Sequence, residues 1–91
     1  MSAEWISHVV RERVREREEN HEAVDPATGL RVRIHRYSGS GSWFLSASGE
    51  LDGEGLTLTA TLAGWRPGND LAAARARCLE LAAILHRTGA R

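Results

Sequence analysis

The sequence predicts an α+β fold, α-β-β-β-α, in which two helices pack on one face of a three-stranded antiparallel sheet. Apolar residues recur at helical spacing near both ends of the chain, alternate with polar residues between them, and are interrupted by the turn signal Asp52-Gly53. These spacings place the apolar side chains on one face of each helix or strand, and that face is expected to be buried. A chain of 91 residues has the size of one small domain, so residues 1–91 are expected to share a single core.

The first helix is expected over about residues 2–20, with Ser2 as a suitable N-cap. One sector of its helical wheel carries Trp5, Ile6, Val9, Val10 and Val14. The run VVRERVRERE at 9–18 also mixes arginines with acids at spacings of three and four, as on a solvated helix. Arg13 and Arg17 continue the apolar sector, so they mark either the edge of the core, covered by their aliphatic stems, or a contact surface for phosphate or an acidic partner.

The same run also fits a strand with its arginines on one face, at positions 11, 13, 15 and 17. The other face would then hold Glu12 and Glu16 beside the valines, which is poor core material. A short strand over 21–24, pairing across a turn at 25–29, is a further alternative.

Three antiparallel strands are expected over about residues 30–37, 43–51 and 55–65. Asp52-Gly53 predicts a two-residue type I′ turn between the last two strands. This turn sets the pairs Leu51–Glu54, Ser48–Thr57 and Ser46–Thr59. A first hairpin centred on Ser40-Gly41, in the loop SGSGS, sets the pairs Arg33–Ser48, His35–Ser46 and Tyr37–Phe44.

The last helix is expected over about residues 70–87, after a proline and glycine at 67–68 and before Gly89. Its inner stripe and the apolar faces of the strands form the expected core: Leu30, Val32, Ile34, Trp43, Leu45, Leu56, Leu58, Leu62, Leu71, Cys78, Leu81 and Leu85. A second stripe on the helix is rich in small residues and permits close approach of another helix. With two free sheet edges as well, we expect a homodimer whose interface contains Ala72, Ala76, Leu79 and Ala83.

The sheet face away from the core is the other candidate surface. It carries serine and threonine hydroxyls together with Arg31, Arg33, His35, Tyr37 and Phe44. Arginines and aromatic rings serve single-strand nucleic-acid binders, yet they also suit a protein contact or an ordinary solvated sheet. With Arg13 and Arg17, these residues are the expected partner-binding set.

Composition narrows the function classes. The 12 basic residues, all arginine, balance 12 acidic ones, which argues against a nonspecific polyanion binder. Cys78 is the single cysteine, so no internal disulfide is expected and a cytoplasmic location is the default. The sequence has neither a run of about 20 apolar residues for a membrane span nor a signal-peptide pattern at its start. A soluble cytoplasmic protein is therefore expected.

No catalytic or metal-binding pattern is expected. The four histidines lack metal-ligand spacing, and Cys78 sits in the middle of an apolar helix stripe. The acids near residues 25 and 50–54 lie in or beside turns, where such residues are common without catalysis. The sequence therefore predicts a noncatalytic protein without a metal or cofactor.

Two family resemblances bear on function. The order helix, three strands, helix resembles the double-stranded-RNA-binding domain over most of the chain, although NDLAAARAR offers only Arg75 and Arg77 where that family has lysines. The C-terminal two-thirds is similar to the HicB-type antitoxin core, and LAGWRPGNDLAAARARCLEL is similar to its turn-and-helix region without the acidic helix start. The first resemblance implies RNA binding, and the second implies binding to a protein.

The expected function is that of a small regulatory or adaptor protein that binds another protein as an inhibitor or antitoxin-like partner, as a dimer. The alternative is a nucleic-acid-binding module that uses the exposed basic and aromatic sheet face. Salt dependence separates the two, because phosphate contacts weaken steeply with salt.

Overall fold

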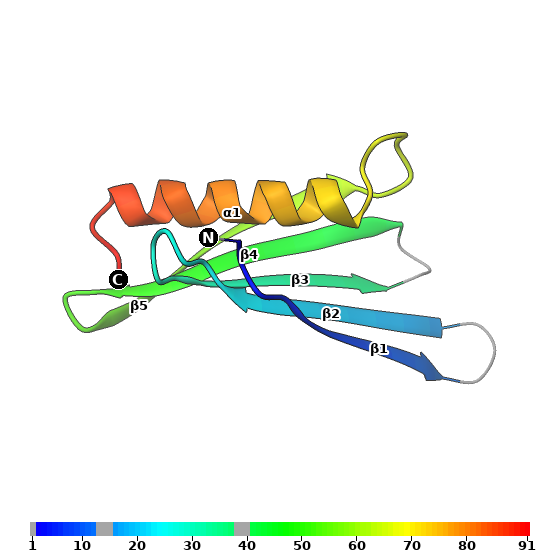
Figure 1. The fold of residues 1–91 in the computed structure, drawn as a ribbon, viewed down its shortest axis with the longest axis horizontal. Coiled ribbons are helices and arrows are strands. Elements are labelled where there is room, and N and C mark those ends of the chain that lie inside the picture. Colours follow the sequence, from blue (N-terminus) through cyan, green and yellow to red (C-terminus); the bar gives the residue numbers. More distant parts are fainter. Residues whose placement is uncertain (1, 13–15, 38–40) are drawn as a thin grey trace.

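The computed structural model describes residues 2–12, 16–37 and 41–91. Within them, five strands precede one helix (Figure 1): β1 Ile6–Glu12, β2 Glu16–Val24, β3 Arg31–Tyr37, β4 Ser42–Leu51, β5 Glu54–Ala63 and α1 Leu71–Arg87. The strands form one antiparallel sheet in chain order, so each pairs with its neighbours along the sequence. The helix lies along one face of β3, β4 and β5. The protein is therefore mostly β.

The predicted first helix over 2–20 is wrong, and with it the three-stranded sheet carrying two helices. Residues 6–12 and 16–24 form the paired antiparallel strands β1 and β2, in which Ile6 lies opposite Glu22. β2 then pairs with β3 from Val24–Arg31 to Glu18–Tyr37. The single strand considered for 9–18 is instead divided, with 9–12 in β1 and 16–18 in β2, and residues 13–15 lie outside the described residues. The short strand considered at 21–24 is part of β2.

The segment forms strands rather than a helix because it can pair with the edge of β3. Helical ion pairs contribute only a few tenths of a kcal/mol each, whereas an unpaired β3 edge would leave a row of backbone donors and acceptors open. The objection that glutamates are poor core material does not apply, because α1 contacts β3, β4 and β5 but neither β1 nor β2 within the described chain. The element order of the double-stranded-RNA-binding domain is therefore absent from the described residues.

The three predicted strands correspond to β3, β4 and β5, although β5 ends at Ala63 rather than 65. The β4–β5 register is confirmed, with Leu51 opposite Glu54 and Ser46 opposite Thr59. The positive φ angles of Asp52 (52°) and Gly53 (81°) fit the predicted type I′ turn.

The predicted β3–β4 register is wrong by two residues. Arg33 lies opposite Ser46 and His35 opposite Phe44. The observed pairs are centred one residue earlier in the chain than a turn at Ser40-Gly41 requires, and this moves each partner on β4 by two residues. Because the error is two residues, every side chain keeps its predicted face of the sheet.

The core lies between the sheet and α1. Eight of the predicted core residues are buried: Leu30, Val32, Ile34, Trp43, Leu45, Cys78, Leu81 and Leu85. Leu56, Leu58 and Leu62 of the outer strand β5 are only partly buried, as is Leu71 in the first turn of the helix. Cys78 donates its thiol hydrogen to the carbonyls of Arg33 (3.5 Å) and Ser46 (3.3 Å), which fixes the helix directly behind these two residues.

The predicted last helix is confirmed as α1. Asp70 caps it by accepting a hydrogen bond from the amide of Ala73 (2.9 Å), and Gly89 follows its end with φ 104°. The helix also holds the N-terminal segment, since the guanidinium of Arg75 lies 5.4 Å from the ring centroid of Trp5. In the described part of the chain no helix is long and apolar enough to cross a membrane.

Candidate functional site

The sheet face opposite α1, here called the open face, extends from β1 to β5. The strand register arranges its side chains in rows that cross the sheet. One row contains Ile6, Glu22, Arg33, Ser46 and Thr59, and the next contains His8, Asn20, His35, Phe44 and Thr61. The two N-terminal strands therefore widen this face and add acidic and amide groups to it.

Asn20 is the centre of a polar network on the open face. Its Oδ1 lies 2.7 Å from Nδ1 of His35 and accepts a longer hydrogen bond from Nη2 of Arg33 (3.4 Å). Its Nδ2 donates to Oε1 of Glu18 at 3.3 Å. Because an amide oxygen only accepts, Nδ1 of His35 carries the proton in this arrangement. The network holds side chains of β2 and β3 in one fixed relation.

Acids of β2 face the basic groups of β3. Nε of Arg33 lies 3.5 Å from Oε1 of Glu22, and Nδ1 of His35 lies 3.8 Å from Oε1 of Glu18. Such exposed pairs contribute at most about 1 kcal/mol to stability. Their main effect is on the local charge, because each acid offsets a basic group that would otherwise make this face positive.

Apolar side chains lie at both ends of this network. At one end, the His35 ring meets Tyr37 edge-on at 4.5 Å between centroids and lies 6.5 Å from the Phe44 ring. Tyr37 is 51% exposed and Phe44 43% exposed. At the other end, Ile6 is 65% exposed and Val24 is 55% exposed. Of the seven large apolar side chains that are exposed among the described residues, these four share the open face.

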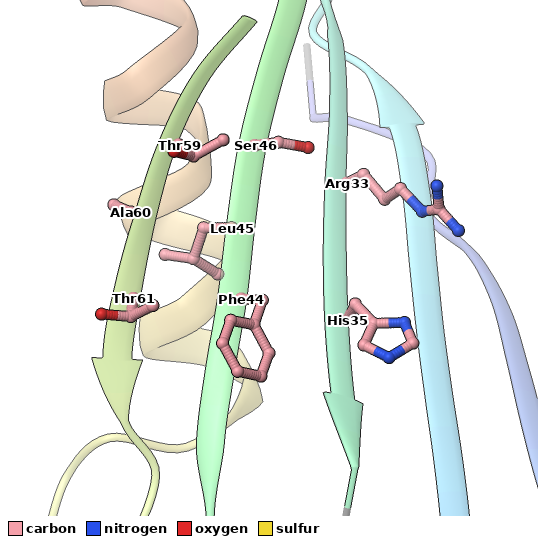
Figure 2. A pocket seen from close by; sticks show the side chains of 8 residues that line it. All are labelled: Arg33, His35, Phe44, Leu45, Ser46, Thr59, Ala60 and Thr61. Atoms are coloured by element: carbon pink, nitrogen blue, oxygen red, sulfur yellow. The ribbon is translucent and has the colours of Figure 1, made fainter. Parts of the chain in front are cut away.

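Two neighbouring hollows follow this surface. Figure 2 shows the first, of about 600 Å³, where Arg33 and His35 extend from β3, Phe44 from β4, and Thr59 and Thr61 from β5. The second, of about 940 Å³, lies toward Ile6, Val24 and Arg31. Arg33 and Ser46 line both hollows, so the two form one continuous surface.

The structure brings together five of the predicted partner-binding residues on the open face: Arg31, Arg33, His35, Tyr37 and Phe44. Arg17 belongs to β2, opposite Arg11, and Arg13 lies outside the described residues. In the described part of this segment, strands β1 and β2 replace the helix that was expected to place these two arginines in one sector. Glu18, Asn20 and Glu22 are site residues that the sequence prediction missed, although their alternation with buried His21 and Ala23 is a strand signal.

The residues expected at a dimer interface lie on one flank of α1. Ala72, Ala76 and Ala83 are exposed, whereas Leu79 is partly buried against the core. Helical periodicity places this stripe on the same flank as Arg75, whose guanidinium covers Trp5. The stripe is therefore next to the N-terminal segment and away from β5.

The described residues offer little reactive chemistry. No group of three or more histidine, cysteine or acidic side chains among them could hold a metal ion. Cys78 is fully buried, and loss of hydration raises the pKa of its thiol above the ordinary value of 9.0. A thiol in that state is a packing group rather than a nucleophile.

Comparison of the chain with protein-family models, with curated proteins and with solved structures found no match. The open face, with exposed apolar side chains at its ends and paired acidic and basic groups at its centre, is the candidate functional surface.

Proposed function

We propose that this protein is a noncatalytic regulatory or adaptor module that binds a protein partner across its open face. The observation that carries the proposal is the exposure of Ile6, Val24, Tyr37 and Phe44 on that one face. Clustered apolar and aromatic side chains mark contact surfaces, whereas single exposed apolar residues need no explanation.

The charge arrangement supports a protein partner over a polyanion. Arg33 faces Glu22 and His35 faces Glu18, so phosphates approaching these two basic groups would also meet two carboxylates. A protein surface can satisfy both signs in the same contact. The Asn20 network also holds these groups in place before binding, which lowers the entropy lost on association.

We also propose that the protein acts in the cytoplasm, because its single cysteine suits a reducing compartment. The homodimer expected from the sequence remains part of the proposal.

The test compares two open-face variants with a matched control. Phe44→Asp and Tyr37→Asp each place a charge among the exposed aromatic rings. The control Val9→Asp places one on the opposite face of β1, where Val9 is 43% exposed. Affinity purification from the native host with each protein identifies the partner. Isothermal titration with the purified partner then measures affinity.

We expect the wild type and Val9→Asp to bind equally. Each open-face variant should lose about 30-fold or more, because aromatic contacts at an interface contribute about 2 kcal/mol or more. Circular dichroism confirms that the variants are folded. Equal binding by all four proteins would contradict the proposal.

Nucleic-acid binding is the second candidate, favoured by one observation. In the described chain Arg31 is exposed and forms no ion pair, and it shares the open face with the aromatic rings of Tyr37 and Phe44. Base stacking on such rings contributes about 1–3 kcal/mol per base. Titration of mixed DNA and RNA pools at about 50 mM salt tests it, since phosphate contacts are strong there and weaken steeply as salt rises. Salt-sensitive binding that Arg31→Ala and Phe44→Ala both abolish would replace the protein-binding proposal.

A further inference from the structure

The outer edge of β5 lacks the features that usually protect a free strand edge. β5 pairs with β4 without interruption from Glu54 to Ala63. Between Gly55 and Ala63 it contains neither a charged residue nor a proline. Free edges of natural sheets are normally short, charged, bulged or covered, because an unprotected one pairs with another strand. The edge of β5 is therefore suited to strand pairing.

The turn at Asp52-Gly53 determines which backbone groups point outward. In a two-residue hairpin the residues that flank the turn, Leu51 and Glu54, bond to each other. Even-numbered residues of β5 therefore bond to β4, and odd-numbered ones direct their N–H and C=O groups to the free edge. The carbonyl of Ala63 is already occupied by the amide of Arg66 and the side chain of Asn69. Thr57, Thr59 and Thr61 form the centre of the available edge.

The same edge leaves apolar surface incompletely covered. Leu56, Leu58 and Leu62 point to the α1 side of β5 and are only partly buried, whereas Ile34 and Leu45 on the inner strands are fully buried. Helical periodicity places Ile84, which is 38% exposed, on the flank of α1 opposite Arg75 and Trp5, which is the flank toward β5. A strand added at this edge would cover these side chains as well as satisfy the backbone.

We infer that β5 pairs antiparallel with β5 of a second copy of this chain, with Thr59 on the two-fold axis, and so joins two five-stranded sheets. In this register Thr57 lies opposite the other copy's Thr61, and cross-strand threonine pairs are favourable. Leu56 lies opposite the other copy's Leu62, and Leu58 opposite its Ala60. Glu54 lies opposite the other copy's Gly64, so the two Glu54 carboxylates remain at opposite ends and no like charges meet.

The helices leave room for this pairing. α1 is centred over β4, since it also contacts β3 and β5 on either side. Two β4 strands separated by two β5 strands lie about 14 Å apart, at about 4.8 Å per strand spacing. Packed helices need only about 8–10 Å. The two helices would therefore not collide, and the leucines and Ile84 would lie between them. This inference names the interface of the homodimer included in the proposed function, but it does not rest on partner binding at the open face.

Light scattering at micromolar concentration tests the inference. Thr59→Pro removes one outward N–H without touching the bonds to β4, and edge strands tolerate proline at such positions. Thr59→Lys places two like charges together on the axis, and Thr59→Val is the matched control. We expect dimers of about 20 kDa, twice the chain mass of 10.0 kDa, for the wild type and Thr59→Val, and monomers for the other two. Circular dichroism of Thr59→Lys confirms the fold if Thr59→Pro unfolds.

Cross-linking then locates the interface. In a Cys78→Ala background, Thr59→Cys should give a covalent dimer with a short bismaleimide, whereas Ala76→Cys on the exposed helix stripe should not. A wild-type monomer, a dimer unaffected by both Thr59→Pro and Thr59→Lys, or cross-linking at Ala76→Cys alone would overturn the inference. Because Phe44 lies outside the edge, loss of dimer and loss of partner binding are separate results.

Discussion

Replacing Ile34 by alanine tests the central relation between the core and the open face. Ile34 is 0% exposed, lies on the central strand β3, and faces α1 between two open-face residues, Arg33 and His35. The change removes three carbons, worth about 0.8 kcal/mol each, or roughly 2.4 kcal/mol in transfer free energy. The cavity left behind raises the cost to about 3–4 kcal/mol, within the range of about 2–5 kcal/mol for such substitutions.

That loss is large for a chain of this length. At about 0.05–0.15 kcal/mol per residue, a domain of this size has a total stability of roughly 5–14 kcal/mol. A loss of about 3 kcal/mol should lower Tm by roughly 12–24 °C. Urea unfolding followed by circular dichroism measures the free energy of unfolding directly.

Two further variants make the Ile34 result interpretable. Ile34→Val leaves a smaller cavity and should cost about 0.5–1.5 kcal/mol. Thr59→Val, on the open face, should change stability by about 0.5 kcal/mol or less. A loss below about 1 kcal/mol for Ile34→Ala would refute the placement of this side chain at the centre of the core.

Three other substitutions test separate parts of the fold by urea unfolding. Asp25 is 5% exposed, and its carboxylate accepts hydrogen bonds from the amide of Ala27 and the hydroxyl of Thr28. Asp25→Ala should therefore lower the free energy of unfolding by about 1–3 kcal/mol. An unchanged urea midpoint would contradict the role of Asp25 in this turn. A Cβ on Gly64 would overlap the carbonyl oxygen of Gly41, so Gly64→Ala should cost about 1–3 kcal/mol. A Cβ on Gly55 meets no atom within 4 Å, so Gly55→Ala is the matched control and should cost little. Burial raises the pKa of Cys78 in the folded state, so the native protein retains a proton that the unfolded chain loses, and stability should fall as pH rises above about 9. Cys78→Ala should remove that alkaline fall, and a wild-type midpoint that stays constant up to pH 10 would refute it.

The C-terminal part of the fold was predictable because its signals are local. Asp52-Gly53 predicted a hairpin and its register, and alternation from Leu30 onward predicted which side chains share a face. The proline and glycine at 67–68 and Gly89 predicted where the helix begins and ends. The loop at 38–42 contains several glycines and serines, which permit more than one turn. The β3–β4 register therefore could not be derived from it.

The two N-terminal strands could not be predicted because the spacing of their apolar and charged residues fits both a helix and a strand. VVRERVRERE satisfies helical ion-pair spacing and strand alternation alike, and the choice depends on which partner is available. A helix about 10 Å wide covers only two or three strands spaced about 4.8 Å apart. Strands beyond that width need no continuous apolar face, so arginines and glutamates are acceptable there.

The candidate site was predictable on β3 and β4, where alternation alone places Arg33, His35 and Phe44 on one face. Its acidic and amide members, Glu18, Asn20 and Glu22, were missed because they belong to β2. Their omission changes the interpretation, since β3 alone is basic and β2 with β3 is nearly neutral.

Because α1 covers only part of the sheet, the sheet has two regions that differ in the free energy of local unfolding. The helix packs against β3, β4 and β5. The other two strands, β1 and β2, are joined to this region by pairing with β3 and by the contact of Trp5, just before β1, with Arg75 of the helix. Regions with fewer buried apolar contacts open locally at lower free energy. Amide protons of β1 and β2 should therefore exchange with solvent sooner than those of β4. Because the Asn20 network crosses from β2 to β3, a partner on the open face would bridge both regions and slow exchange in the first hairpin.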